Sequence, residues 1–167
     1  GLAVTDVMVV KLARRPGVDE ARKAGATLGK FKGHEALTLA AGASGGIAEL
    51  VLGLALRTYE FTPHKTGDKP TAKPAIVMVS KPDLAQAAAA PMLALAEGVF
   101  LTRDLVNEPA NVLTTTEFAL RLEALRHLGV EVEVLDEPAL ATLGMGALLG
   151  VGQGSDSPSK VAVMQWK

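Results

Sequence analysis

The sequence predicts an α/β protein in which helices cover parallel strands. Strand-like and helix-like segments alternate along its 167 residues, 49% of the residues are hydrophobic, and only 4% are aromatic. A core rich in Ala, Leu and Val is typical of helices packed on buried strands. Strands separated by helices favour a parallel sheet. The alternation falls into two regions joined by a long helix.

The first region, residues 1–82, is predicted to be a βαβαβ unit. Apolar, β-branched runs indicate strands, and apolar residues that recur every three to four positions indicate helices. The expected strands are 4–12, 35–41 and 75–80, and the expected helices are 18–32 and 45–57. Ser44 is expected to cap the second helix, whereas Gly25 and Gly29 weaken the first. Pro and Gly residues make 62–74 a loop.

A long helix over 83–106 is predicted to link the two regions. Pro91 lies inside it, so the helix either restarts there, with the proline in its first turn, or kinks. Pro109 ends the helix soon after Asn107, because the residue before a proline avoids the helical conformation.

The second region, residues 107–167, is predicted to begin another αβαβ unit. Its expected helices are 114–128 and 137–143, and its expected strands are 130–135 and 161–166. Thr114 or Thr115 is expected to cap the first helix, and Gly129 to end it. The glycine-rich run 144–155 is interpreted as a tight turn with close backbone approach, since a strand rather than a helix follows it.

Composition narrows the class of protein. The net charge is −1, from 17 basic and 18 acidic residues, so bulk charge does not indicate a nucleic-acid surface, although such binding is left open. The chain has no Cys, which excludes a disulfide scaffold and a thiolate metal site. No uninterrupted apolar run reaches the ~18–20 residues of a membrane span. A cytoplasmic protein is therefore expected, and the first residue, Gly1 rather than Met, suggests a chain that starts after its natural beginning.

Several local patterns resemble catalytic or binding motifs. The run GATLGK at 25–30 is one residue too short for a phosphate-binding loop and lies in a helical pattern. The three histidines have no ligand-pair spacing and are interpreted as surface residues: His34, His64 and His127. Asp104 and Glu108 share a helical face, so paired acid–base chemistry is conceivable, but Arg57 and Arg103 offer simple ion-pair partners.

The run GASGG at 42–46 fits the nucleophile-elbow pattern G-x-S-x-G, with a strand before it and a helix after it. Ser44 would be the nucleophile. Among later residues only His127 is a candidate base, and no convincing Asp partner follows. This serine-hydrolase interpretation stays open as an alternative.

Three segments of the second half carry a resemblance to a known family. They are AEGVFLTRDLVNEPANVLT at 96–114, LGVEVEVLDEPALATLGMGALLGVGQGS at 128–155 and VAVMQW at 161–166. On these segments the chain resembles the leucyl aminopeptidase (cytosol aminopeptidase) family. The segment YEFTPHKT at 59–66 is similar to the one that closes the small N-terminal domain in that family. The first 50 residues match only in the order of their elements.

The resemblance implies a macro-like α/β domain over 1–82, incomplete at its N-terminus, a linking helix over 83–106, and the start of the catalytic α/β domain over 107–167. It also implies a cytoplasmic homo-hexamer that removes N-terminal residues from peptides. Two divalent metal ions, Mn or Zn, would bind the substrate amine and carbonyl and activate a bridging water.

The family's metal-binding and catalytic residues lie in segments that would follow Lys167, so the resemblance assigns no catalytic, metal-binding or substrate-binding role to any residue here. It implies a structural role at the domain junction for seven residues, which are Asn107, Glu108, Pro109, Asn111, Gly150, Gly152 and Gly154. The chain is thus expected to be a fragment of the enzyme, inactive alone. The alternative is a non-enzymatic macro-like module that binds nucleotides. In a fragment, Val161, Val163 and Trp166 would face water.

Overall fold

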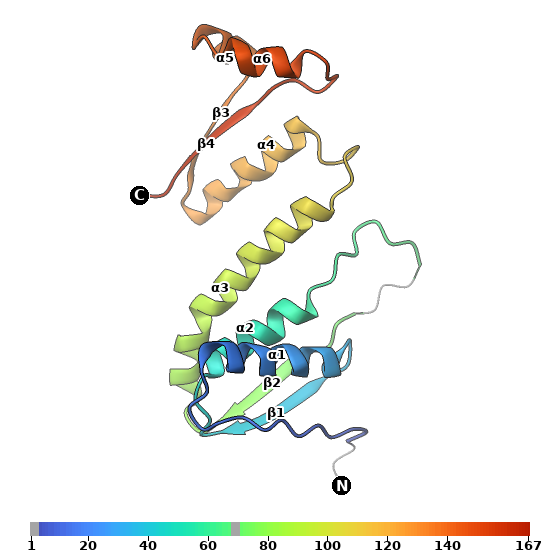
Figure 1. Ribbon diagram of the computed structural model, residues 1–167, viewed down its shortest axis with the longest axis vertical. Coiled ribbons are helices and arrows are strands. Elements are labelled where there is room, and N and C mark those ends of the chain that lie inside the picture. The colour runs from blue at the N-terminus through green and yellow to red at the C-terminus, as the bar shows by residue number, and fades with distance from the viewer. Residues whose placement is uncertain (1–3, 68–70) are drawn as a thin grey trace. The chain divides into compact units, whose positions relative to one another are not determined.

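The computed structural model describes residues 4–67 and 71–167. These form a mixed α/β fold, as predicted (Figure 1). The chain divides into two compact units, which we call unit 1 (Gly1–Asp104) and unit 2 (Leu105–Lys167). The predicted boundaries at 82 and 106 belong to a domain assignment that stays a prediction.

Unit 1 contains a two-stranded parallel sheet with two helices on one face. The elements are α1 (Val18–Lys32), β1 (Leu37–Gly42), α2 (Ile47–Thr58) and β2 (Ala75–Val79). The register runs from Leu37 opposite Ala75 to Gly42 opposite Val79. Strand order and direction in this sheet agree with the prediction, because α2 is long enough to carry the chain back to the start of a parallel strand.

The core of unit 1 lies between the helices and one sheet face. Ala24 and Leu28 of α1 pack with Leu50 and Leu54 of α2, and Leu37, Leu39 and Ala75 of the strands lie against this cluster. The opposite sheet face is open, since Ile76 and Met78 are each 57% exposed. The strand predicted at 75–80 is therefore covered on one face only among the described residues, although its continuously apolar sequence is typical of a strand buried on both faces.

Main-chain atoms of α1 and α2 come into direct contact through glycine. A Cβ on Gly25 would lie 1.9 Å from the carbonyl oxygen of Leu50, and one on Gly53 would lie 2.1 Å from the carbonyl oxygen of Arg22. A Cβ on Gly29 would lie 2.9 Å from Cβ of Arg57. These glycines therefore set the spacing of the helix pair, a role that outweighs their low helix propensity.

Two predictions about the ends of these elements are wrong. Residues 4–12 are extended but form no ladder with another described strand; Val10 and Leu12 pack on the core while Val7 and Val9 are 80% and 89% exposed. This segment is therefore attached to the core through the side chains of Val10 and Leu12 and not through main-chain pairing with a described strand. Ser44 does not cap α2, because Gly46, with φ of 69°, holds the N-cap position.

Helix α3 (Pro82–Asn107) runs without interruption through Pro91, so of the two alternatives predicted there, a restart and a kink, the restart does not occur. Among the described residues it is the one helix long and apolar enough to cross a membrane. That test alone is weak evidence, because single helices of soluble proteins also pass it. Residues 68–70 of the predicted loop before β2 lie outside the described residues.

Unit 2 contains α4 (Thr115–Glu123), a 3₁₀ segment η1 (Ala124–Leu128), β3 (Glu131–Leu135), α5 (Glu137–Thr142), α6 (Gly146–Gly152) and β4 (Val161–Gln165). The Thr114 side chain accepts from the amide of Glu117, as predicted for a capping threonine. Gly129, with φ of 94°, follows η1. Arg126 donates from Nε and Nη2 to the carbonyl of Val132 in β3, over 3.0 and 2.5 Å.

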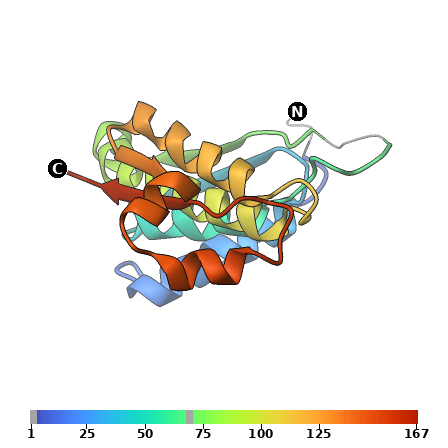
Figure 2. The same cartoon turned by 90° about the horizontal axis from the view of Figure 1, so that it is seen from above.

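The parallel arrangement predicted for this unit is wrong. β3 and β4 are antiparallel, with Leu135 opposite Val161 and Glu131 opposite Gln165 (Figure 2). The helices between them do not form a crossover. They belong to an excursion that leaves the end of β3 and returns to the same end, where the amide of Ser159 bonds the Glu137 carboxylate at 2.9 Å.

Candidate functional site

The NEPAN segment, residues 107–111, forms the turn between α3 and α4. The segment begins at Asn107, the last residue of α3, and the carbonyl of Pro109 accepts from the amides of Val112 and Leu113, both at 2.9 Å. Asn111 is exposed within this turn. Helix α3 thus ends at Asn107, as predicted from the position of Pro109.

Glu108 is held by Arg121 of α4. Nη1 of Arg121 donates to Glu108 over 2.8 Å, and its Nε donates to Glu117 over the same distance. The Glu108 side chain is only 6% exposed. The bonds to Glu117 and Glu108 raise the pKa of Arg121 above its ordinary value. One arginine therefore ties the turn to the first turn of α4.

Asp104 and Glu108 have separate partners rather than forming an acid–base pair. The hydroxyl of Tyr59 donates to Asp104 over 2.7 Å within unit 1, whereas Glu108 pairs with Arg121 within unit 2. Arg57 and Arg103, which the sequence suggested as ion-pair partners of these carboxylates, make other contacts. Arg103 donates to the carbonyl of Leu56 at 2.8 Å, and the stem of Arg57 lies against Gly29.

The glycine-rich run is a short helix and a following loop, not the tight turn predicted. Gly146 to Gly152 form α6, and Gly144 has φ of 72°. A Cβ on Gly152 would lie 2.0 Å from Oγ of Ser159, while Gly150 and Gly154 face open space among the described residues. The structural role at the domain junction that the resemblance implies for these glycines stays a prediction.

Ser44 gains no support as a nucleophile. It is exposed in the loop between β1 and α2. Its neighbour Gly45 donates its amide to the carbonyl of Arg14 at 2.9 Å, and a Cβ on Gly46 would lie 2.9 Å from Pro16. His127 bonds through Nδ1 to the carbonyl of Ala124 and belongs to the other unit. Gly45 and Gly46 of this loop therefore contact residues 14–16 closely.

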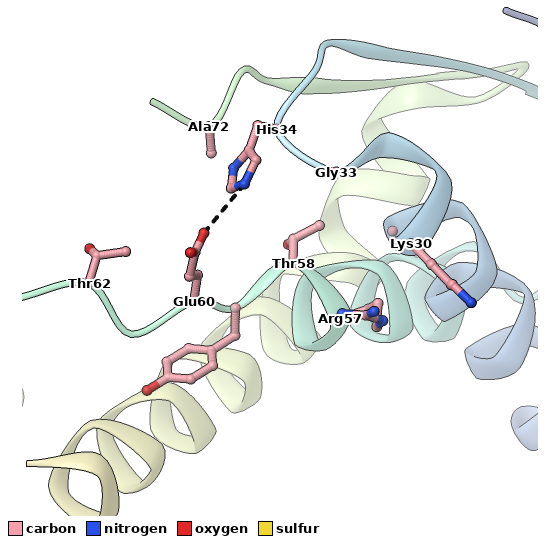
Figure 3. Close-up of a pocket in the computed structure, with 10 residues that line it drawn as sticks. Lys30, Gly33, His34, Arg57, Thr58, Glu60, Thr62 and Ala72 are labelled. Carbon is pink, nitrogen blue, oxygen red and sulfur yellow. Dashed lines mark ion pairs between the residues drawn. The ribbon is translucent and has the colours of Figure 1, made fainter. Parts of the chain in front are cut away.

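A hollow of about 460 Å³ lies where α1 and α2 end (Figure 3). Its lining includes Lys30, His34, Arg57, Thr58 and Glu60. His34 and Glu60 face each other at 3.6 Å across it. Lys30 and Arg57 occupy the last turns of their helices, where a cation is favourable whatever the hollow contains. Charges of both signs line the hollow, so its electrostatics select no class of ligand.

The Glu60 carboxylate is expected to titrate below its ordinary range. Its bond with Lys65 lowers its pKa, and so does the charge of His34. A carboxyl group whose pKa is lower in the folded state than in the unfolded state stabilises the fold at pH values above the unfolded-state pKa. This small contribution is lost as the pH falls through the folded-state pKa. In an NMR titration, Lys65→Ala should raise the pKa of Glu60. Lys73→Ala should instead raise that of Glu35, which Lys73 lowers, and leave Glu60 unchanged.

The described residues hold no group of three His, Cys, Asp or Glu side chains arranged to bind a metal ion. The two metal ions that the resemblance implies thus find no fitting ligand set among them. A metal site of the family's kind would need carboxylates clustered around an open coordination position.

Known proteins match the chain along its length. The family model for the catalytic domain of the cytosol aminopeptidase family matches residues 100–167. A "Probable cytosol aminopeptidase" of Cereibacter sphaeroides is 54% identical over 167 residues, and one of Dinoroseobacter shibae is 57% identical over 166 residues. The alignments cover 100% and 99% of this chain but 34% of each relative.

A solved structure, the "Bottromycin maturation enzyme BotP in complex with Mn", matches with a TM-score of 0.75 and 30% identity, over 91% of this chain and 34% of that one. The chain thus spans about a third of the length of the curated relatives that it matches. Since the sequence match extends from end to end and the fold agrees, the chain belongs to the cytosol aminopeptidase family.

Proposed function

We propose that the chain is part of a metal-dependent leucyl aminopeptidase that removes N-terminal residues from peptides with two metal ions. The carrying observation is the 54% identity, over the whole chain, to a relative named for this activity. The chain accounts for a third of that relative, and its described residues offer no metal site. In this proposal the catalytic and metal-binding residues belong to other parts of the enzyme.

In this proposal the chain contributes scaffold rather than chemistry. Unit 1 is most of a macro-like N-terminal domain, and α3 links it to the start of the catalytic domain in unit 2. The Glu108–Arg121 pair and the Pro109 turn stabilise the start of unit 2, directly after the boundary with unit 1. The metals, Mn or Zn, would polarise the scissile carbonyl and activate water when bound. The Mn-bound relative supports Mn as one choice. The enzyme would work in the cytoplasm as a homo-hexamer.

The exposed apolar residues of unit 2 support a larger catalytic sheet. Val163 is 39% exposed, Met164 48% and Trp166 73%. Val161 is half-buried, so the exposure expected for it is only partial. A strand edge of this kind is normally covered by further structure.

An activity assay tests the proposal. With Mn²⁺ or Zn²⁺, a protein of the relatives' full length that contains this chain should cleave leucine p-nitroanilide and lose activity to a chelator. The chain 1–167 alone should not exceed the metal-only background. Turnover by 1–167 that Asp104→Asn or Glu108→Gln abolishes would overturn this placement of the active site.

The nucleotide-binding alternative has a separate test but no supporting contact. The Gly45 amide, which could have met a phosphate, already bonds Arg14. Calorimetry with ADP-ribose should therefore give no saturable heat with the chain. Saturable binding that disappears in Gly45→Leu would favour the module instead.

A further inference from the structure

A cluster of four side chains joins the segment after α2 to the second half of α3. We call it the Tyr59 latch: Tyr59, Phe100, Arg103 and Asp104. The rings of Tyr59 and Phe100 stack with centroids 5.3 Å apart. Cζ of Arg103 lies 5.2 Å from the centroid of the Tyr59 ring, and the Tyr59 hydroxyl donates to Asp104 over 2.7 Å. The tyrosine is therefore held at both its ring and its hydroxyl.

Arg103 extends the latch to the main chain of α2. Its Nη1 donates to the carbonyl of Leu56 over 2.8 Å. Leu56 lies in the last turn of α2, where carbonyls lack partners within the helix. The arginine thus satisfies a helix end while its planar group contacts an aromatic ring, a combination that lysine could not reproduce.

Outside the latch, this half of α3 buries little apolar surface against the rest of the described residues. Of its 26 residues only Ala89 and Ala96 are buried, and these side chains are small. Leu93 and Leu95 are 43% and 50% exposed. Hydrophobic stabilisation scales with the apolar area removed from water, so two alanines contribute little. The aromatic and charged contacts of the latch carry a large share of the attachment.

We propose that the Tyr59 latch is a conformational device that holds the second half of α3 on unit 1, with Tyr59 as its positioning residue. Opening the latch frees residues 93–107 while α1, α2, β1 and β2 stay folded. Asp104 is the last residue of unit 1, so the latch fixes the point at which the chain leaves that unit. The proposal does not rest on the proposed catalytic function.

Amide hydrogen exchange of the 167-residue chain, followed by mass spectrometry, tests the latch. Tyr59→Ala removes the ring and should speed exchange in residues 93–107 by on the order of tenfold, with exchange in α1 unchanged. Tyr59→Phe removes only the hydroxyl and should give a smaller increase in the same residues. Asp104→Asn keeps an acceptor and should exchange more slowly there than Asp104→Ala.

Phe61→Leu is the matched control, since Phe61 lies in the same segment but contacts the His64 ring. It should leave exchange in α3 unchanged. Unaltered α3 exchange in Tyr59→Ala would overturn the proposal, as would equal acceleration in α1 and α3. If Tyr59→Ala fails to fold, Tyr59→Phe and the two Asp104 variants decide by the same comparison.

Discussion

Gly25→Ala and Gly53→Ala should each destabilise unit 1 by about 3 kcal/mol, at the upper end of what overpacking costs. Each new methyl group would meet a carbonyl oxygen of the opposite helix, at 1.9 Å for Gly25 and 2.1 Å for Gly53. Backbone atoms cannot turn aside as a side chain can, so α1 and α2 must separate. Urea unfolding followed by circular dichroism at the helical wavelength measures the loss.

Gly98→Ala provides the matched control for these two substitutions. Gly98 also lies inside a helix, but a Cβ there would meet no described atom within 4 Å. Alanine should therefore stabilise the chain by about 0.5–1 kcal/mol through helix propensity alone. If all three variants gained stability, the close approach of α1 and α2 would be refuted.

Arg121→Met should cause the second large loss, this time in unit 2. It removes the ion pair between Arg121 and the nearly buried carboxylate of Glu108, and losing a charged partner away from water is far more costly than breaking a surface pair. Arg121→Met should lower the urea midpoint of unit 2 several times more than the control substitution Arg22→Met lowers the urea midpoint of unit 1. Arg22 pairs with Glu49 at 2.6 Å, but its side chain is 43% exposed.

A second substitution separates the charge effect from lost packing. Adding Glu108→Gln to Arg121→Met removes the carboxylate charge that lost its arginine and should recover part of the loss in the urea midpoint. Equal midpoints in the single and double variants would mean that Glu108 carries no buried charge penalty. Exchange in residues 115–123 gives an independent reading of α4.

Much of the fold could be predicted because apolar periodicity is a local signal. The helix over 18–32 and the strand at 75–80 were placed within a residue or so, and Thr114 and Gly129 mark the helix ends as their chemistry requires. Strand direction in unit 2 was not predictable in this way. Whether a connection crosses over or folds back depends on contacts between distant residues, such as the bond from Ser159 to Glu137. The periodicity of apolar residues carries no information about such contacts.

The candidate site was harder to predict, because its contacts join distant parts of the sequence. Tyr59 and Asp104 are 45 residues apart, and neither stands out in its own segment. Glu108 was singled out, but its partner Arg121 was missed in favour of nearer arginines. The helix contact does have a local signal in the sequence. Gly25 and Gly29 are one helical turn apart, a spacing that brings small residues onto a single helix face.

The bond from Arg126 to Val132 has a consequence for self-association. The Val132 carbonyl accepts two hydrogen bonds from one guanidinium, so this carbonyl of β3 is already engaged within the molecule and is less available to a strand from another molecule. Among the described residues, no side chain bonds to the main chain of β4 in this way. Met164 in β4 and Trp166 directly after it are exposed. Intermolecular sheet growth, the first step toward aggregation of this chain, is therefore directed to β4 and discouraged at β3.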